Sequence, residues 1–244
     1  MNVSTEQRRI FNSQVLDPVV QKFRPQNQLL SGFMAMEGRD YARSRKLMVV
    51  GRAVNSWGDG QTVTQLRDET NCKGFTDSIH EQFTGCKMAW VAESEGSQDG
   101  YNTNNSAFWR VIKRVSKELN LWGENSESDW SSRLVWSNLY KISPQAGGNP
   151  SDALCALQER GCIELLRQEI IDYAPERVLF LTGMTWAWPF MAGLGCRLRA
   201  MQGLVEARGS IELPGERASI PFVVAAHPQG KDESSWVQLV LEAF

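Results

Sequence analysis

The sequence predicts an α/β protein with three layers, in which helices cover both faces of a central, mainly parallel sheet. Three observations lead to this prediction. Short apolar runs alternate along the chain with longer amphipathic segments, a pattern typical of strand–helix–strand units. The right-handed crossovers that such units use place successive strands parallel. At 244 residues, 42% of them hydrophobic, the chain is also long enough to bury the core of one large domain.

Five segments have the spacing or composition of helices. The first begins at Ser4, whose side chain is a suitable N-cap, and ends at Pro25. The clearest is at 105–119, where apolar residues recur at i, i+4, i+7 and i+11. The others are residues 151–173, a short aromatic segment from Thr185, and residues 233–244.

Six apolar runs predict strands, and their ends predict where a ligand would bind. The runs are 46–50, 87–91, 133–139, 178–181, 205–213 and 220–226. In an open α/β sheet the ligand crevice lies at the carboxyl ends of the strands. We therefore expect one rim to carry the segments 51–60, 138–148, 182–186 and 227–231.

The outer face of segment 105–119 is basic. Arg110, Lys113, Arg114 and Lys117 fall at i, i+3, i+4 and i+7. These four cations form either a solvated face or a surface that contacts the phosphates of a DNA backbone. The net charge of −2 excludes a global positive field that would draw the protein onto nucleic acid or a membrane, and it favours the solvated face.

Several classes of site have no support in the sequence. The five cysteines are scattered without a CxxC pair, as expected for reduced thiols in a cytoplasmic protein. HxxxH and HExxH are absent, so no metal is expected. GxxxxGK[ST], GxGxxG and GxSxG are absent as well, so we expect no cofactor and no serine nucleophile. No run approaches the roughly 18 apolar residues of a membrane span, so no membrane partner is expected.

Two polar residues stand where strands are expected to end. Asn138, in WSNLYKISP, offers a donor and an acceptor to the edge of a planar ring, or is satisfied by backbone. His227, in FVVAAHPQGK, follows an apolar run, and the only other histidine is His80. A lone histidine is more often structural than catalytic, but its place on the expected rim makes His227 a candidate. The loop GRAVNSWGDG, at 51–60, has glycines that permit close backbone approach.

Taken in order, these segments resemble the uracil-DNA glycosylase superfamily from about Lys46 to Lys231. The loop GRAVNSWG resembles the GMNPGPWG form of the family's motif A, NLYKISP resembles its N-x-x-K-x-x-P, and His227-Pro228 resembles the start of its HPS motif. A further segment, CIELLRQEIIDYAPERVLFLTG, resembles the family's cysteine–helix–proline–strand–glycine segment. The matching residues are Gly51, Trp57, Gly58, Asn138, Lys141, Pro144, Cys162, Pro175, Gly183, His227 and Pro228.

The resemblance implies one domain over 1–244, with a helical extension at 1–45, a glycosylase-like core at 46–231 and a closing helix at 232–244. It also implies that a base in DNA is flipped into a pocket, and that a histidine, here His227, stabilises the departing base anion. The residues implied to bind the base are Gly51, Arg52, Trp57, Phe75 and Asn138.

The chain departs from the family where water is activated. Ala53 and Arg52 stand where the family has Asp, Asn or Glu, and neither side chain can orient water as a base. Asn55 is the candidate replacement in the catalytic role, with Asp59 as an alternative. Cys162 alone matches the iron–sulfur branch, so no cluster is expected.

Two functions of different class follow from the resemblance. The first is a divergent DNA glycosylase that binds or hydrolyses a base in DNA. The second is a non-catalytic member of the fold that binds a nucleobase, a nucleotide, nucleic acid or a protein. Loss of the motif A acid favours the second, and retention of Asn138 and His227 supports the first.

Overall fold

A computed structural model describes residues 4–81, 86–122, 127–213 and 219–244. The chain divides into two compact units, each assembled from three stretches of sequence. Unit 1 comprises Met1–Ala35, Gly51–Thr84 and Ser137–Tyr173. Unit 2 comprises Met36–Val50, Gly85–Trp136 and Ala174–Phe244. The single domain expected from the sequence stays a prediction.

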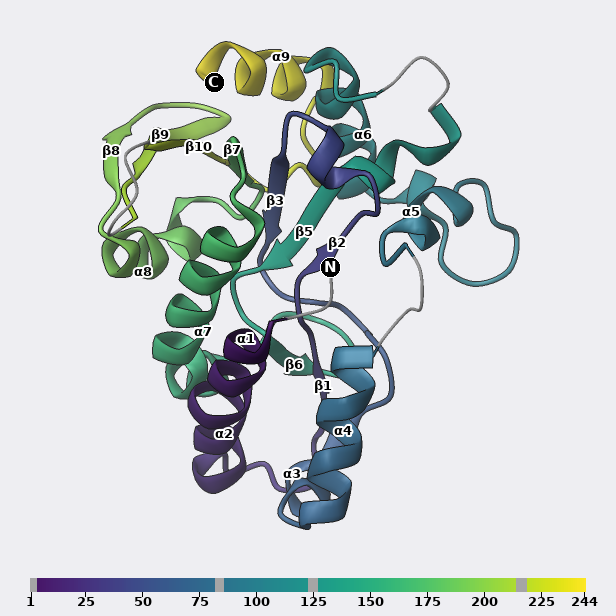
Figure 1. Cartoon of the computed structure of the whole chain (residues 1–244), viewed down its shortest axis with the longest axis vertical. Coiled ribbons are helices and arrows are strands. Elements are labelled where there is room, and N and C mark those ends of the chain that lie inside the picture. The colour runs from purple at the N-terminus through teal and green to yellow at the C-terminus, as the bar shows by residue number, and fades with distance from the viewer. Residues whose placement is uncertain (1–3, 82–85, 123–126, 214–218) are drawn as a thin grey trace. The chain divides into compact units, whose positions relative to one another are not determined.

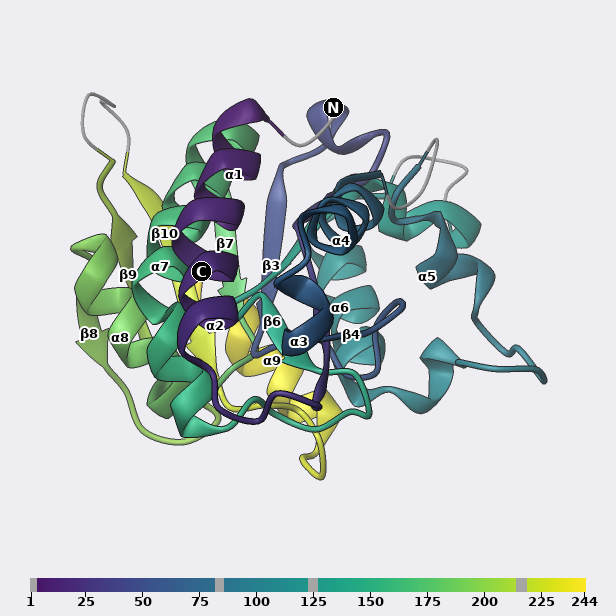
Figure 2. The same ribbon diagram turned by 90° about the horizontal axis from the view of Figure 1, so that it is seen from below.

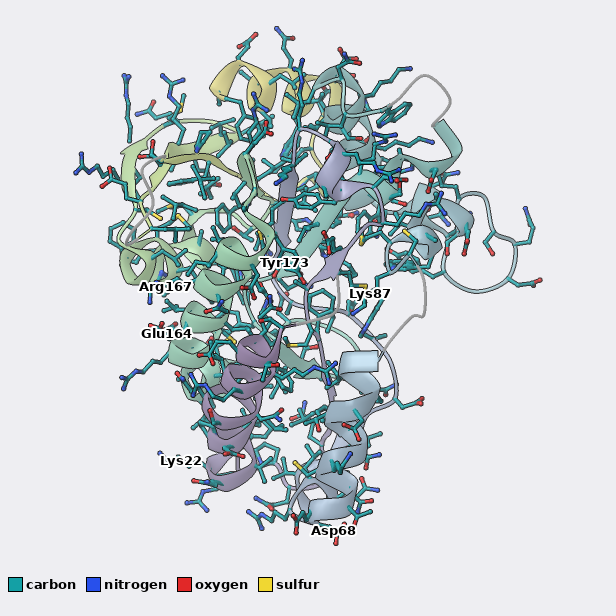
Figure 3. The ribbon with its side chains drawn as sticks, viewed as in Figure 1. Lys22, Asp68, Lys87, Glu164, Arg167 and Tyr173 are labelled. Atoms are coloured by element: carbon teal, nitrogen blue, oxygen red, sulfur yellow. The ribbon has the colours of Figure 1, made fainter. Side chains whose placement is uncertain are left out.

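Unit 1 begins with the helical segment that Ser4 was expected to cap. The segment runs through α1 (Thr5–Ile10), the π-helical η1 (Phe11–Leu16) and α2 (Asp17–Lys22), and the Ser4 hydroxyl accepts a hydrogen bond from the backbone N–H of Gln7 at 3.1 Å. It packs along α7 (Asp152–Tyr173), as Figures 1 and 2 show. On α7 itself, the exposed faces carry local pairs such as Glu164 with Arg167, 2.6 Å apart (Figure 3).

Unit 1 also holds a small antiparallel sheet. Its order is β4 (Gln61–Thr62), β1 (Leu29–Gly32) and β6 (Ile142–Pro144). The short helix α3 (Val63–Leu66) leads to α4 (Glu69–Glu81), which packs against β1. Asp68, labelled in Figure 3, accepts from the backbone N–H of Asn71 at 3.0 Å at the start of α4.

A seven-stranded sheet forms the core of unit 2. Its order is β2 (Met36–Glu37), β5 (Leu134–Asn138), β3 (Leu47–Gly51), β7 (Arg177–Phe180), β10 (Ile220–Ala225), β9 (Val205–Ile211) and β8 (Arg197–Ala200). The pairs β3–β7 and β7–β10 are parallel. The pairs β2–β5, β10–β9 and β9–β8 are antiparallel. The sheet is therefore mixed, and not mainly parallel as predicted, because short links such as the one between β8 and β9 allow antiparallel pairing.

Helices α6 (Ala107–Glu118), α8 (Met184–Leu194) and α9 (Glu233–Ala243) confirm three of the predicted helices. Both α8 and α9 pack against β9 and β10, and α6 packs against α9. Short 3-10 turns complete the unit: η2 (Tyr41–Arg43), η3 (Thr103–Asn105) and η4 (Glu127–Arg133). In the part of the chain that the structure describes, no helix combines the length and the apolar character that a bilayer-spanning helix needs.

The strand predicted at 87–91 is wrong, because α5 (Ala89–Glu93) occupies this segment. Helical backbone lets Trp90 join an aromatic cluster, with its ring centroid 5.6 Å from that of Trp109 and 5.8 Å from that of Trp136. Trp109 and Trp136 are themselves 5.1 Å apart. Packing of this kind overrides the weak strand propensity of a five-residue run.

Candidate functional site

The loop after β3 is tied to the chain that follows β5, within unit 1. The backbone N–H groups of Leu139 and Tyr140 donate to the carbonyl oxygens of Gly51 and Arg52, at 2.8 and 2.9 Å. Further along, the Ser143 hydroxyl donates to the Val54 carbonyl at 2.9 Å. Two of the segments expected on one rim, 51–60 and 138–148, therefore do lie together.

Asn138 ends β5 at the base of this loop pair. Its side chain is 1% exposed, and its amide nitrogen Nδ2 has no hydrogen-bond partner among the residues that the structure describes. A buried donor left without a partner costs about 1–3 kcal/mol, and native structures leave few of them. A ligand that presents a hydrogen-bond acceptor to Nδ2 would recover that energy.

Two aromatic rings lie close to the segment that carries Asn138. The half-buried Trp57 meets the buried Phe33 edge to face, with ring centroids 6.2 Å apart. The backbone N–H of Phe33 in turn donates to the carbonyl of Lys141 at 2.9 Å. A half-exposed indole is suited to contact a planar ligand.

Lys141 is held inside the core. Its side chain is 0% exposed, and Nζ lies 2.8 and 2.9 Å from the two carboxylate oxygens of Glu169, whose side chain is also fully buried. Nζ donates to the Ser137 hydroxyl at 2.7 Å, and that hydroxyl donates to Glu169 at 2.6 Å. This closed network, which we call the Lys141 network, holds the backbone on both sides of Asn138, so the lysine of the family-like motif has a structural role here.

Gln158 of α7 fixes the same segment from its other side. Its Oε1 accepts from the backbone N–H groups of Lys141 and Ile142, at 3.1 and 2.8 Å, and its Nε2 donates to the Ile142 carbonyl at 2.7 Å. Neither Gln158 nor Glu169 was predicted as a site residue from the sequence. Both are polar residues on the inward face of the helix predicted at 151–173, and that position could have indicated a buried polar contact.

The cysteines near this segment are poor nucleophiles. Burial raises the pKa of the Cys162 thiol to about 12 and that of the Cys155 thiol to about 11. Because the thiolate is the reactive form, neither residue offers a nucleophile at neutral pH.

The remaining unit 1 candidates lie in different surroundings. Asn55 is exposed, and its Oδ1 accepts from the backbone N–H of Gly148 at 2.7 Å. That bond helps to hold the loop pair together. Phe75 is buried on α4, where its ring occupies the space beside Gly32 of β1.

His227 follows β10 in unit 2. Its Nδ1 accepts from the backbone N–H of Gln229 at 3.3 Å, which places the proton of the neutral ring on Nε2. The ring stacks on Phe108, with centroids 6.4 Å apart and planes inclined by 23°. In this tautomer Nε2–H is a donor, as stabilisation of an anion requires. Asn138 belongs to unit 1, so the expected meeting of His227 and Asn138 stays a prediction.

The four cations of α6 all have partners inside unit 2. Arg110 pairs with Glu233 at 2.5 Å, and Lys113 pairs with Glu95 at 2.7 Å. Arg114 donates to the Ser234 hydroxyl at 3.2 Å, and the Lys117 ammonium lies 5.6 Å from the centre of the Trp122 ring. These contacts favour a structural face over a phosphate-binding surface.

Within the described part of the chain, no three His, Cys, Asp or Glu residues form a group that could hold a metal ion.

Comparison with known proteins does not identify a family for this chain. No family model and no curated protein matches the sequence. Among solved structures, one that is similar is a domain of unknown function (DUF1537) from Bordetella bronchiseptica, crystallised as a domain-swapped dimer with bound citrate. The two are 16% identical with a TM-score of 0.31, over 80% of this chain and 39% of that one. A likeness of this size supports no conclusion about function. The protein is of the α/β class, with a mixed seven-stranded sheet.

Proposed function

We propose that the protein binds a nucleobase at the end of β5, as a divergent relative of the uracil-DNA glycosylase superfamily with little or no hydrolytic activity. The observation that carries the proposal is the buried Nδ2 of Asn138, which has no partner among the described residues. A base carbonyl is an acceptor of the right kind for this donor. The amide oxygen of the same side chain can accept from a ring N–H.

Two further features support base binding. The Lys141 network and Gln158 hold the backbone around Asn138, so the amide is preorganised for its ligand. The half-buried Trp57, which packs edge to face on the buried Phe33, supplies an aromatic ring in the same unit.

The loss of hydrolysis is proposed from the motif A loop. Ala53 has no polar side-chain atom, and Arg52 stays protonated. The side chain of Asn55, two residues further on, is exposed, and its oxygen accepts from the backbone N–H of Gly148. A positioned acid–base group contributes about 10²–10⁴-fold to a rate, and this loop shows none in the family's position.

Binding of free bases by calorimetry tests the proposal. Uracil, cytosine, hypoxanthine and xanthine are titrated into the wild type, the Asn138→Asp variant and an Asn149→Asp control. Asn149 is exposed on the neighbouring loop, so the control repeats the charge change away from the buried donor. We expect at least one base to bind the wild type and the control, and to bind Asn138→Asp about 5- to 150-fold more weakly, as loss of a buried hydrogen bond predicts. Equal binding by all three proteins, or binding by none, refutes the proposal.

Excision from uracil-containing oligonucleotides tests the catalytic part. We expect little or no excision by the wild type, partial rescue in Ala53→Asn or Ala53→Asp, and loss of the rescue when His227→Ala is added. Robust excision by the wild type would contradict the proposal that hydrolysis is lost, and it would point to Asn55 or Asp59 as the water-activating group.

A further inference from the structure

The amino ends of three neighbouring strands lie together in unit 2. In the seven-stranded sheet, β3 lies between β5 and β7 (Figure 1). The Ser44 hydroxyl donates to the carbonyl oxygen of Arg133, just before β5, at 3.0 Å, and accepts from the backbone N–H of Lys46, just before β3, at 3.2 Å. The Lys46 carbonyl accepts from the backbone N–H groups of Glu176 and Arg177, at the start of β7, at 2.9 and 3.4 Å. Ser44 and Lys46 therefore tie the three strand ends together.

The surface formed by residues 39–46, 129–133 and 174–177, which we call the amino edge, is rich in cations. Four of its basic side chains form no ion pair, hydrogen bond or ring contact within the described part of the chain: Arg45, Lys46, Arg133 and Arg177. Arg45 is exposed, and the other three are half-buried. Because the whole chain has a net charge of −2, this concentration of positive charge is local. Like charges held close together repel one another, and an anionic partner would relieve that repulsion.

The carboxylates of the amino edge do little to offset these four cations. Asp40 lies 3.3 Å from Arg39 and 3.6 Å from Arg43, and Asp129 also pairs with Arg39. Among the acidic residues of the three segments, this leaves the exposed Glu176, which has no partner in the described part of the chain. The amino edge thus presents four unpaired cations against one unpaired carboxylate.

The spacing of the strands favours an extended ligand over a small one. Neighbouring strands lie about 4.8 Å apart, so the backbones of Arg133 and Arg177, two strands apart, are separated by roughly 10 Å. A single carboxylate group is too small to span that distance. In an extended peptide, side chains on alternate residues follow one another at about 7 Å, so successive carboxylates can meet successive cations along the edge.

The amino edge offers no aromatic surface on which bases could stack. Its two aromatic residues, Tyr41 and Trp130, are both buried. The exposed aromatic side chains Tyr101 and Trp188 belong to other segments. Because nonspecific sites for single-stranded nucleic acid combine cations with aromatic rings, the composition of the edge favours acidic side chains as its ligand.

We propose that the amino edge binds an extended acidic segment of a partner protein, whose carboxylates pair with Arg45, Lys46, Arg133 and Arg177. A guanidinium group binds a carboxylate with two parallel hydrogen bonds, and complementary charge speeds association and selects the partner. The proposal goes beyond the proposed function and does not depend on it. Arg133 stands just before β5, whereas Asn138 is the last residue of that strand.

Fluorescence anisotropy with a labelled peptide of alternating glutamate and serine tests the site. The variant Arg45→Gln/Arg177→Gln is compared with Arg199→Gln/Arg208→Gln, which removes the same charge from β8 and β9 of unit 2, at cations that likewise lack partners in the described part of the chain. The first variant should bind the peptide about 2- to 30-fold more weakly than the wild type, as loss of two exposed ion pairs predicts. The control should bind it as the wild type does. An equal loss in both variants, or no binding by the wild type, overturns the proposal.

A second variant removes charge from the link between β5 and β3. Lys46 has a φ of 38°, in the left-handed region that asparagine tolerates well, so Arg45→Gln/Lys46→Asn changes charge at little cost to the backbone. It should weaken peptide binding by the same factor of about 2 to 30 and keep the circular dichroism spectrum of the wild type. Unchanged peptide binding in this variant overturns the proposal.

Three further probes identify the class of ligand. A peptide of alternating glutamine and serine should not bind, and free glutamate at the same concentration of carboxylate should not displace the acidic peptide. An oligothymidylate with the same number of charges should bind more weakly than the acidic peptide. Displacement by free glutamate would show a site for small anions, and equal binding of the oligothymidylate would show a general polyanion surface; either result overturns the proposal. Asn138→Asp should bind the acidic peptide as the wild type does, whether or not the titration with free bases succeeds, so failure of one proposal is distinguishable from failure of the other.

Discussion

Replacing Lys141 with methionine tests the Lys141 network directly. The change keeps a long unbranched side chain and removes the charge that faces Glu169 at 2.8 and 2.9 Å. Both side chains are fully buried, so Glu169 would be left with one described donor, the Ser137 hydroxyl. Breaking a buried ion pair from one side costs about 3–5 kcal/mol. That is a large share of the roughly 5–15 kcal/mol by which native proteins are stable.

Urea denaturation followed by circular dichroism measures the loss, and two variants interpret it. Lys73→Met removes one member of an exposed pair with Asp77 on α4 of the same unit, and it should cost no more than about 0.5 kcal/mol. The triple variant Ser137→Ala/Lys141→Met/Glu169→Leu replaces the whole network with apolar groups, and it should recover most of the stability lost in Lys141→Met, because uncompensated charge and not lost volume causes the damage.

A loss below about 1 kcal/mol in Lys141→Met, the size expected of an exposed pair, would refute the reasoning. So would a triple variant as unstable as the single one. The first result would mean that water reaches Glu169, and the second that packing volume sets the cost.

Two more predictions follow from glycines and thiols. A Cβ on Gly161 of α7 would lie 2.1 Å from the Gln14 carbonyl oxygen in η1, so Gly161→Ala should strongly lower the urea concentration at the midpoint of unfolding. A Cβ on Gly74 of α4 would meet nothing within 4 Å, so Gly74→Ala should raise the free energy of unfolding by about 0.5–1 kcal/mol. Burial raises the pKa of the Cys162 and Cys196 thiols to about 12 from an ordinary 9.0. The thiols of the unfolded chain ionise first, so the free energy of unfolding should fall as the pH rises above about 9. A thiol reagent at pH 8 should label the fully buried Cys162 only after unfolding. A Cys196→Ala variant that loses as much stability at high pH as the wild type would contradict the argument from the thiol pKa. An unchanged urea midpoint in Gly161→Ala would contradict the argument from packing.

Local patterns in the sequence predicted the long helices and the buried strands well. The stripe of apolar residues in α6 and the Ser4 cap are local signals, and both are confirmed. The strands that were missed, β1, β2, β4, β6 and β8, are two to four residues long. Each is a strand only because another segment pairs with it, and β8, with the sequence RLRA, is polar because it lies at an edge. The mixed character of the sheet comes partly from the missed strands β2 and β8. It also comes from the antiparallel pairing of β9 and β10, two strands whose existence was predicted but whose direction was not.

Some features of the candidate site could likewise be predicted from the sequence, and others could not. The end of a predicted strand was enough to single out Asn138, and its neighbour, the loop at 51–60, followed from the rule for parallel strands. The partner of Lys141 could not be predicted, because Glu169 is 28 residues away and only the packing of α7 brings the two together. The close approach of Gln14 in η1 to Gly161 of α7 could not be predicted either, because it exists only once the two segments are packed.

The division into two units has a consequence for any attempt to express part of this protein by itself. The chain passes from one unit to the other five times, after residues 35, 50, 84, 136 and 173. Neither unit is a continuous piece of the gene, so no single truncation yields either of them, and neither can be grafted onto another protein by joining ends. Even β3 and β5 are shared, since their last residues, from Gly51 and from Ser137, belong to unit 1. A fragment that stops at Trp136 would therefore lack Asn138 and all of α7, and only co-expression of complementary fragments could rebuild the site from pieces.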